Sequence, residues 1–162
     1  MNGVSIVRGA KFAAVLLAAL AIAGCAKHGA DPTNAMASAA APGSQQDFVV
    51  NVGDRVFFDT DSSDLSAQAR ATLDKQADWL NHYSQYSFTI EGHADERGTR
   101  EYNIALGARR AETVRDYLTS RGISGQRMRT ISYGKERPVA VCDDISCWAQ
   151  NRRAVTVLDQ SS

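Results

Sequence analysis

An acidic and a basic side chain, Asp95 and Arg110, stand where charged groups can recognise a ligand. Asp95 lies in the polar stretch that follows Gly92, and Arg110 lies in the apolar stripe of a helix predicted further along the chain. A guanidinium on the inward flank of a helix has to be paired or to face a polar cleft, because an unpaired buried charge is costly. The two side chains can therefore form a structural salt bridge, or each can face one charge of a zwitterionic ligand.

A strand and a helix position these two residues. Residues 87–91 alternate polar and apolar side chains, which predicts a strand that ends at the following glycine. Residues 100–121 are predicted to form a helix whose inward face carries Gly107, Ala111, Val114 and Leu118. On the same helical wheel Asn103 joins Arg110 beside this face, whereas Arg109 points to the far side as an ordinary solvated charge.

No metal site is predicted. His93 and Asp95 form an H-x-D pattern that lacks a third ligand at a recognisable spacing, so we expect His93 to hydrogen-bond within the turn. The acidic run at residues 59–64 is similar in composition to a calcium loop, but it lacks the glycine and the distal glutamate of an EF-hand. We therefore expect neither segment to hold a metal ion.

Four strands and two helices are predicted in the order β-α-β-α-β-β. The first strand is predicted at residues 55–59, and a helix follows at residues 66–82, where apolar residues recur at helical spacing. After the central strand and helix, two more strands are predicted at residues 128–133 and 153–158. This order indicates an α/β (α+β) two-layer sandwich, with two helices packed on one face of a mixed four-stranded sheet.

Three motifs resemble those of a known family. They are G-H-A-D-E-R-G-x-x-E-Y-N-x-x-L-G-x-R-R-A at residues 92–111, S-Y-G-K-E-R-P at residues 132–138 and A-Q-N-R-R-A-V at residues 149–155. Together they resemble the OmpA-like peptidoglycan-binding domain family over about residues 52–158. Motifs of this length, in this order, are highly specific.

The resemblance implies a ligand for Asp95 and Arg110. In the family, the matching carboxylate and arginine hold the zwitterionic end of diaminopimelate in the peptidoglycan stem peptide, which favours separate ligand-facing positions over a salt bridge. A carboxylate can accept from the ammonium, and a guanidinium can clamp the carboxylate bidentately. Matching positions also give possible ligand contacts at Thr60, Asp61, Asn103, Leu106 and Arg152. Thr60 is less apolar than the family pattern, and for Arg152 a structural role in its loop remains an alternative.

The first 24 residues have the pattern of a secretory signal peptide, because a basic segment precedes an apolar run too short for a comfortable membrane span. Their end, I-A-G-C, resembles a bacterial lipobox, which implies cleavage before Cys25 and lipidation of that cysteine. The absence of an aspartate after the cysteine favours the outer membrane. Residues 25–46 are rich in Ala, Ser and Gly and are predicted to be a flexible tether, so the binding domain is expected at residues 47–162.

Two further cysteines, Cys142 and Cys147, flank the sequence D-D-I-S and depart from the family pattern. In an exported protein, two cysteines this close are predicted to form a disulfide. Their spacing excludes a redox C-x-x-C motif, and no histidine is placed to activate a thiol. Arg100 is a second departure, because the family often has a helix-starting proline there.

Composition and motifs favour a structural binding protein over three other classes. The formal net charge of the 162 residues is zero, so the sequence has no electrostatic footprint for nucleic acid. An enzyme acting on peptidoglycan would need two carboxylates about a cleft, a catalytic metal or an activated nucleophile, and no such set is recognisable in the sequence. A stator-type motor protein with the same domain would need a membrane helix in place of the lipobox.

The resemblance implies an outer-membrane lipoprotein whose periplasmic domain binds diaminopimelate-type peptidoglycan and so joins membrane to cell wall, without a cofactor. For lipoprotein members of the family it also implies membership of the Tol system, which serves envelope integrity and constriction of the outer membrane at cell division. The implied protein partner is the periplasmic β-propeller protein TolB, with other Tol proteins as possible further partners. A domain that acts mainly by docking TolB is the alternative function.

Overall fold

The computed structural model describes residues 40–159. The predicted signal peptide at residues 1–24, the lipidation site at Cys25 and the predicted tether as far as residue 39 lie outside the described residues. The elements follow in the order α2 (Gln45–Asp47), η1 (Phe48–Gly53), β1 (Arg55–Phe57), α3 (Ala67–His82), β2 (Phe88–His93), α4 (Arg100–Ser120), η2 (Gly125–Arg127), β3 (Met128–Gly134), α5 (Ile145–Asn151) and β4 (Arg153–Leu158).

The compact unit begins at Ala40, earlier than the predicted domain start at Asp47. The carbonyl of Gly43 accepts a hydrogen bond from the Tyr86 hydroxyl at 2.8 Å, and its amide donates one to Asp47 at 2.9 Å. The hydroxyl of Ser44 caps the short helix α2. A stretch of small residues without periodicity carries no signal from which such contacts can be predicted.

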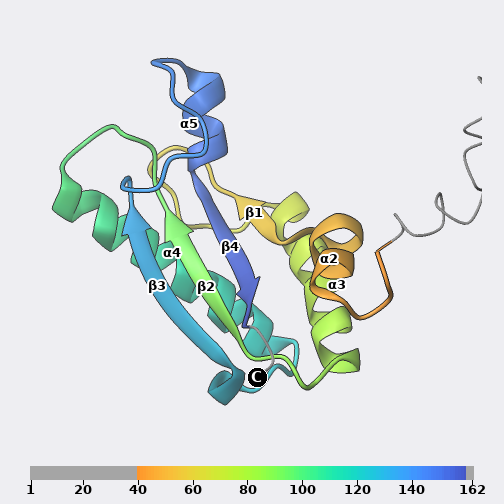
Figure 1. Ribbon diagram of the computed structural model, residues 1–162. Coiled ribbons are helices and arrows are strands. Elements are labelled where there is room, and N and C mark those ends of the chain that lie inside the picture. Colours follow the sequence, from red (N-terminus) through yellow and green to blue (C-terminus); the bar gives the residue numbers. More distant parts are fainter. Residues whose placement is uncertain (1–39, 160–162) are drawn as a thin grey trace, which may run out of the picture. The chain divides into compact units, whose positions relative to one another are not determined.

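The four strands form one mixed sheet in the order β1-β4-β2-β3 (Figure 1). β2 and β3 are parallel, and β4 pairs antiparallel with both β1 and β2. The crossover between the parallel strands is α4, which packs against β2 and β3, while α3 packs against β1 and α4. The predicted two-layer fold, with two main helices and a mixed four-stranded sheet, is therefore confirmed.

The core lies between the two long helices and the sheet. Its most deeply buried side chains include Leu73 and Leu80 of α3, Val114 and Leu118 of α4, and Phe88 and Ile90 of β2. Burying one face of each helix in this way leaves the other face to solvent, as the helical periodicity of the sequence predicts. Within residues 40–159, no helix is both long enough and apolar enough to cross a membrane.

The predicted elements are confirmed with changes at their ends. β1 ends at Phe57, two residues before the end of the predicted strand. β2 does not stop at Gly92, because Gly92 pairs with Ala154 on one side and Ser132 on the other, and the strand continues to His93 after a bulge. Backbone pairing therefore overrides the local signal of a glycine.

α5 lies between β3 and β4, where no helix is predicted. It has seven residues, too few to show a helical period in the sequence. Asp144 caps its first turn by accepting from the backbone amide of Ser146 at 2.7 Å. This short helix lies at the end of the sheet from which β4 starts (Figure 1).

A contact between two glycines sets the distance of α4 from the sheet. A Cβ atom added to Gly92 of β2 would lie 1.8 Å from the carbonyl oxygen of Gly107 on α4. A Cβ atom added to Gly107 would lie 2.4 Å from the Ser132 hydroxyl and 2.8 Å from the Gly92 carbonyl oxygen. The helix therefore rests directly on strand backbone, and Arg110, one turn further on, is brought close to the end of β2.

Replacement of Gly107 by alanine should lower the free energy of unfolding by about 1–3 kcal/mol, because the added methyl group forces the helix away from the strand. Chemical denaturation of the purified chain measures this value. Gly125→Ala is the matched control, since a Cβ atom there meets only the end of the Arg115 side chain at 3.8 Å. Equal denaturation midpoints for the two variants would contradict the close contact.

Candidate functional site

A cleft opens where three segments meet: the loop after β1, the loop between β2 and α4, and the first half of α4. Its volume is about 300 Å³, and its lining residues are Thr60, Asp61, Asp95, Arg97, Gly98, Tyr102, Asn103, Leu106 and Arg110. The structure thus brings together six of the seven residues predicted to contact a ligand. The exception is Arg152, which does not line this cleft.

Arg110 is fully buried and binds the backbone of the neighbouring segments. Its Nε donates to the carbonyl of Ser62 at 2.8 Å, its Nη1 to that of His93 at 2.8 Å and its Nη2 to that of Asp59 at 3.1 Å. A guanidinium has five N–H donors, so one N–H on each terminal nitrogen has no acceptor among the described residues. Burial, with the nearby charge of Arg152, lowers the pKa of Arg110 to about 10, which leaves it protonated at neutral pH.

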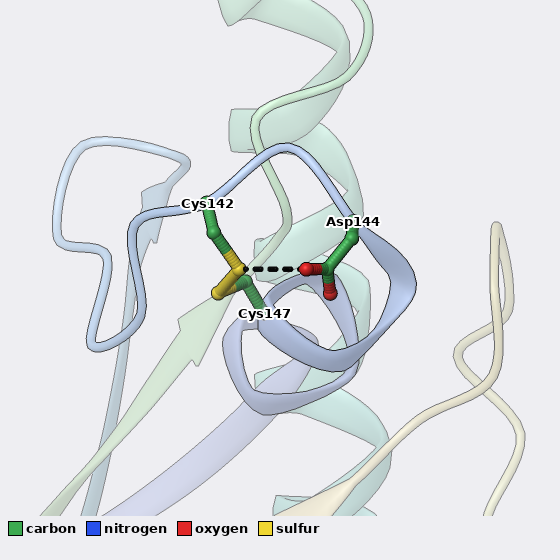
Figure 2. A group of neighbouring side chains, drawn as sticks. All are labelled: Cys142, Asp144 and Cys147. Carbon is green, nitrogen blue, oxygen red and sulfur yellow. Dashed lines mark hydrogen bonds between the residues drawn. A yellow bond between two sulfur atoms is a disulfide. The ribbon is translucent and has the colours of Figure 1, made fainter.

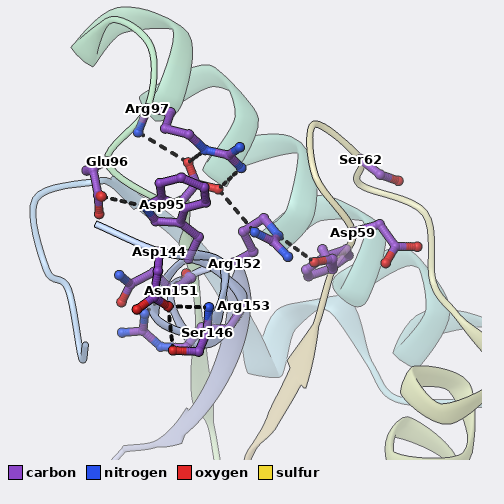
Figure 3. Close-up of polar contacts among 12 residues, drawn as sticks. Asp59, Ser62, Asp95, Glu96, Arg97, Asp144, Ser146, Asn151, Arg152 and Arg153 are labelled. Atoms are coloured by element: carbon purple, nitrogen blue, oxygen red, sulfur yellow. Dashed lines mark hydrogen bonds and ion pairs between the residues drawn. The ribbon is translucent and has the colours of Figure 1, made fainter. Parts of the chain in front are cut away.

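Asp95 lies in the loop between β2 and α4, and two arginines hold its carboxylate (Figure 3). Arg97 donates to Oδ1 from its backbone amide at 3.2 Å and from Nε at 3.1 Å, and to Oδ2 from Nη2 at 2.7 Å. Arg152 donates to Oδ2 from Nη1 at 3.3 Å. Burial raises the pKa of Asp95, but the hydrogen bonds and charge of Arg97, with the hydrogen bond from Arg152, outweigh it and hold the pKa below its usual value.

Asp95 and Arg110 do not bond each other, and they line the same cleft with different partners. The alternative of a structural salt bridge between them is therefore wrong. Arg152 does not line the cleft and contacts the site through its bond to Asp95. Its side chain is 9% exposed, and its Nε donates to the carbonyl of Phe58 at 3.0 Å.

Asp61 and Tyr102 connect the loop after β1 with α4. The Tyr102 hydroxyl donates a hydrogen bond to the carboxylate of Asp61. Asp61 has a φ of 57°, the left-handed region that residues other than glycine seldom adopt and that clusters at functional sites. Tyr102, Arg97 and Gly98 were missing from the predicted contacts, although all three lie in the motif at residues 92–111.

Asn103 and Leu106 support the cleft from α4. The Asn103 side-chain amide donates to the carbonyl of Arg97 at 2.7 Å, which fixes the backbone of the loop against the helix. Leu106 is 5% exposed and adds an apolar wall. Thr60 is exposed and lines the cleft.

His93 is buried, and neither ring nitrogen has a hydrogen-bond partner among residues 40–159, so the predicted hydrogen bond within the turn is wrong. The residue serves the site through its carbonyl, which accepts from Arg110. Burial, with the positive charges of Arg153, Arg137 and Arg55, lowers the pKa of His93 from 6.5 to about 4. The ring is therefore neutral at pH 7, and the approach of Glu91 to 3.6 Å is not an ion pair.

Cys142 and Cys147 are joined by a disulfide at the start of α5 (Figure 2). Their Cα atoms are 5.7 Å apart, within the usual range for a disulfide. A carboxylate oxygen of Asp144 lies 3.3 Å from the sulfur of Cys142. Cys142, Asp144 and Cys147 are the metal-ligand side chains found close together within residues 40–159. Because both cysteine sulfurs are in the disulfide, neither is a thiolate that could bind a metal.

Residues 57–152 match the OmpA family model. The chain is 70% identical over 148 residues to the peptidoglycan-associated lipoprotein of Rhizobium meliloti, with 88% of this chain and 84% of that protein covered. It is 43% identical over 157 residues to the protein of the same name from Pseudomonas aeruginosa, with 88% and 93% covered.

Solved structures show the same fold. The crystal structure of the peptidoglycan-associated lipoprotein from Burkholderia pseudomallei is 45% identical and superposes with a TM-score of 0.64, covering 65% of this chain and 90% of that one. The C-terminal domain of Helicobacter pylori MotB superposes with a TM-score of 0.62 over 67% of this chain and 86% of that one. At 19% identity, the second match is evidence for the fold alone.

The buried His93 should make the fold sensitive to mild acid. In the unfolded chain a histidine binds a proton near pH 6.5, whereas folded His93 binds one only near pH 4, so the stability contributed by its neutral ring is lost as the pH falls between these values. The difference between these two pKa values corresponds to a loss of about 3 kcal/mol in the free energy of unfolding. The measurement is the free energy of unfolding of the purified chain from pH 7 to pH 4.

His93→Gln, which cannot be protonated, should flatten this pH dependence, whereas the exposed His82→Gln should leave it unchanged. A wild-type slope that persists in His93→Gln would show that other groups cause the acid sensitivity.

Proposed function

Because the chain belongs to the OmpA family and, within it, to the peptidoglycan-associated lipoproteins, we propose that its cleft binds the zwitterionic end of diaminopimelate in the peptidoglycan stem peptide. One observation carries the proposal: Asp95 and Arg110 line a single cleft without bonding each other. Membership of this family also confirms that the chain is a structural binding protein and not an enzyme.

The chemistry of the two side chains suits such a ligand. The far end of diaminopimelate, where it is not cross-linked, carries an ammonium and a carboxylate on one carbon. Asp95 is ionised at neutral pH and can accept from the ammonium, while the two remaining N–H groups of Arg110 can donate to the carboxylate. Each charge of the ligand then has a partner of opposite sign in a partly water-excluded site, where such pairs are strongest.

Selectivity against a lysine stem peptide follows from the same arrangement. Lysine ends in an ammonium alone and would leave the two free N–H groups of the buried Arg110 without an acceptor. Leaving a buried donor unpaired costs binding free energy, so a site built for a carboxylate discriminates against a ligand that lacks one.

Arg110 also stabilises the fold, because its three backbone hydrogen bonds would be lost with its side chain. Loss of binding in an Arg110 variant therefore does not separate the two roles of the residue. Asp95 gives the cleaner test, since Asn keeps the shape of the side chain while it removes the negative charge and replaces one acceptor oxygen by an NH2 group.

We further propose that the chain is anchored in the outer membrane by lipid on Cys25 and that its folded domain lies in the periplasm. The I-A-G-C motif supports lipidation, and a relative 70% identical to this chain is named as a lipoprotein. Three acyl chains, each burying methylenes worth about 0.8 kcal/mol apiece, give stable anchoring. Binding of the domain to peptidoglycan would then join the outer membrane to the cell wall.

TolB is the protein partner that we propose, with other Tol proteins as further candidates, and envelope integrity and outer-membrane constriction at cell division as the processes served. This part of the proposal is supported by the likeness to lipoprotein members of the family. It adds a partner to the peptidoglycan-binding function and does not replace it.

The proposed ligand is tested by co-sedimentation of the full chain, kept in detergent, with purified sacculi of the diaminopimelate type and of the lysine type. The wild type should pellet with the first type only, and Asp95→Asn should weaken this binding about tenfold or more. Arg109→Gln, which changes an exposed arginine next to Arg110, should bind as the wild type does. Equal binding to both types would move the function toward docking of TolB.

The proposed anchor is tested by labelling cells with radioactive palmitate. The wild type should be labelled and should fractionate with the outer membrane, whereas Cys25→Ser should lose both properties because it lacks the thiol that accepts lipid. A variant that lacks the other two cysteines, Cys142→Ser with Cys147→Ser, is the matched control and should stay labelled. Continued labelling of Cys25→Ser would place the lipid elsewhere.

A further inference from the structure

The carboxylate of Asp95 has no free capacity in the structure. Three donors come from Arg97 and one from Arg152, at 2.7 to 3.3 Å. An ionised carboxylate offers about four lone-pair sites, so these four donors occupy all of them. A ligand ammonium can therefore reach Asp95 only if one of the present donors leaves.

Of the four donors, those of the Arg97 side chain are the ones that can leave. The Arg152 side chain is 9% exposed and is also held by the carbonyl of Phe58, and the backbone of Arg97 is fixed by Asn103. The Arg97 side chain, by contrast, is 42% exposed and lines the cleft.

Trp148 of α5 holds the Arg97 guanidinium in place. The guanidinium carbon lies 4.2 Å from the centre of the Trp148 ring, a cation–π contact, while the same guanidinium bonds Asp95. The indole N–H donates to the carboxylate of Glu96, which binds the ring to the same loop. Cys147, the residue before Trp148, is fixed by its disulfide.

We propose that Arg97 is a specificity-determining residue of the cleft, because its guanidinium occupies the position at Asp95 that a ligand ammonium has to take. This inference rests on the proposed function. A zwitterionic ligand compensates the exchange, since its ammonium replaces Arg97 on Asp95 and its carboxylate can accept from the displaced guanidinium. A ligand with an ammonium alone displaces Arg97 and returns no partner to it. Arg97 thus adds to the selectivity that Arg110 provides.

The test compares two soluble stem tripeptides, one ending in diaminopimelate and one in lysine, which differ by a single carboxylate. Titration calorimetry with the full chain in detergent gives the dissociation constants of both peptides. The ratio compared is that of the lysine peptide divided by that of the diaminopimelate peptide. In Arg97→Gln, where no cation competes for Asp95, this ratio should fall about fivefold, mainly through tighter binding of the lysine peptide. Trp148→Leu should shift the ratio in the same direction by less, and Arg109→Gln should leave it as in the wild type.

A ratio in Arg97→Gln equal to that of the wild type, or weaker binding of both peptides, would overturn the role of Arg97. Asp95→Asn separates this failure from that of the proposed function. If the wild type prefers the diaminopimelate peptide and Asp95→Asn lacks this preference, the proposed function stands. The ratio measured in Arg97→Gln then decides whether Arg97 determines specificity. If the wild type binds neither peptide, the proposed function and the role of Arg97 both fall.

Discussion

The burial of one guanidinium is the constraint on which the site depends. Arg110 reaches from α4 to the carbonyls of Asp59 and Ser62 in the loop after β1 and of His93 at the end of β2, so one side chain fixes three segments far apart in sequence. Its position is set in turn by the contact of Gly107 with the strand below. A buried cation is tolerated here because carbonyl dipoles surround it, and the same bonds hold its remaining donors in a fixed direction.

The negative charge of the cleft, the carboxylate of Asp95, has a different kind of hydrogen-bond partner. The carboxylate of Asp95 accepts from the side chains of two arginines, one buried and one exposed, and from the backbone amide of Arg97. The cleft therefore combines a rigid cation with an anion whose exposed partner can be exchanged. Such a combination suits the proposed zwitterionic ligand, because it offers one partner to each of the two charges. The short helix α5 contributes to this half of the site through Trp148 and the residue at its end, Arg152.

The sequence predicts the fold well because hydrophobic periodicity fixes the strands and the two long helices, and the motif at residues 92–111 brings Asp95 and Arg110 to one place. It does not predict what those charges bond. The acceptors of Arg110 are backbone carbonyls, which every residue has, so no side-chain pattern marks them. α5 is missed because seven residues show no helical period. The unpaired ring of His93 is missed because burial, and not residue type, decides its environment.

A crystal structure of the full chain with a stem tripeptide that ends in diaminopimelate is the most direct test of the zwitterion site. The ligand ammonium should lie within hydrogen-bond distance of the Asp95 carboxylate, and the ligand carboxylate should accept from Nη1 and Nη2 of Arg110. Arg110 should at the same time keep its bonds to the carbonyls of Asp59, Ser62 and His93. A ligand bound outside the cleft, or with its carboxylate away from Arg110, would contradict the assignment.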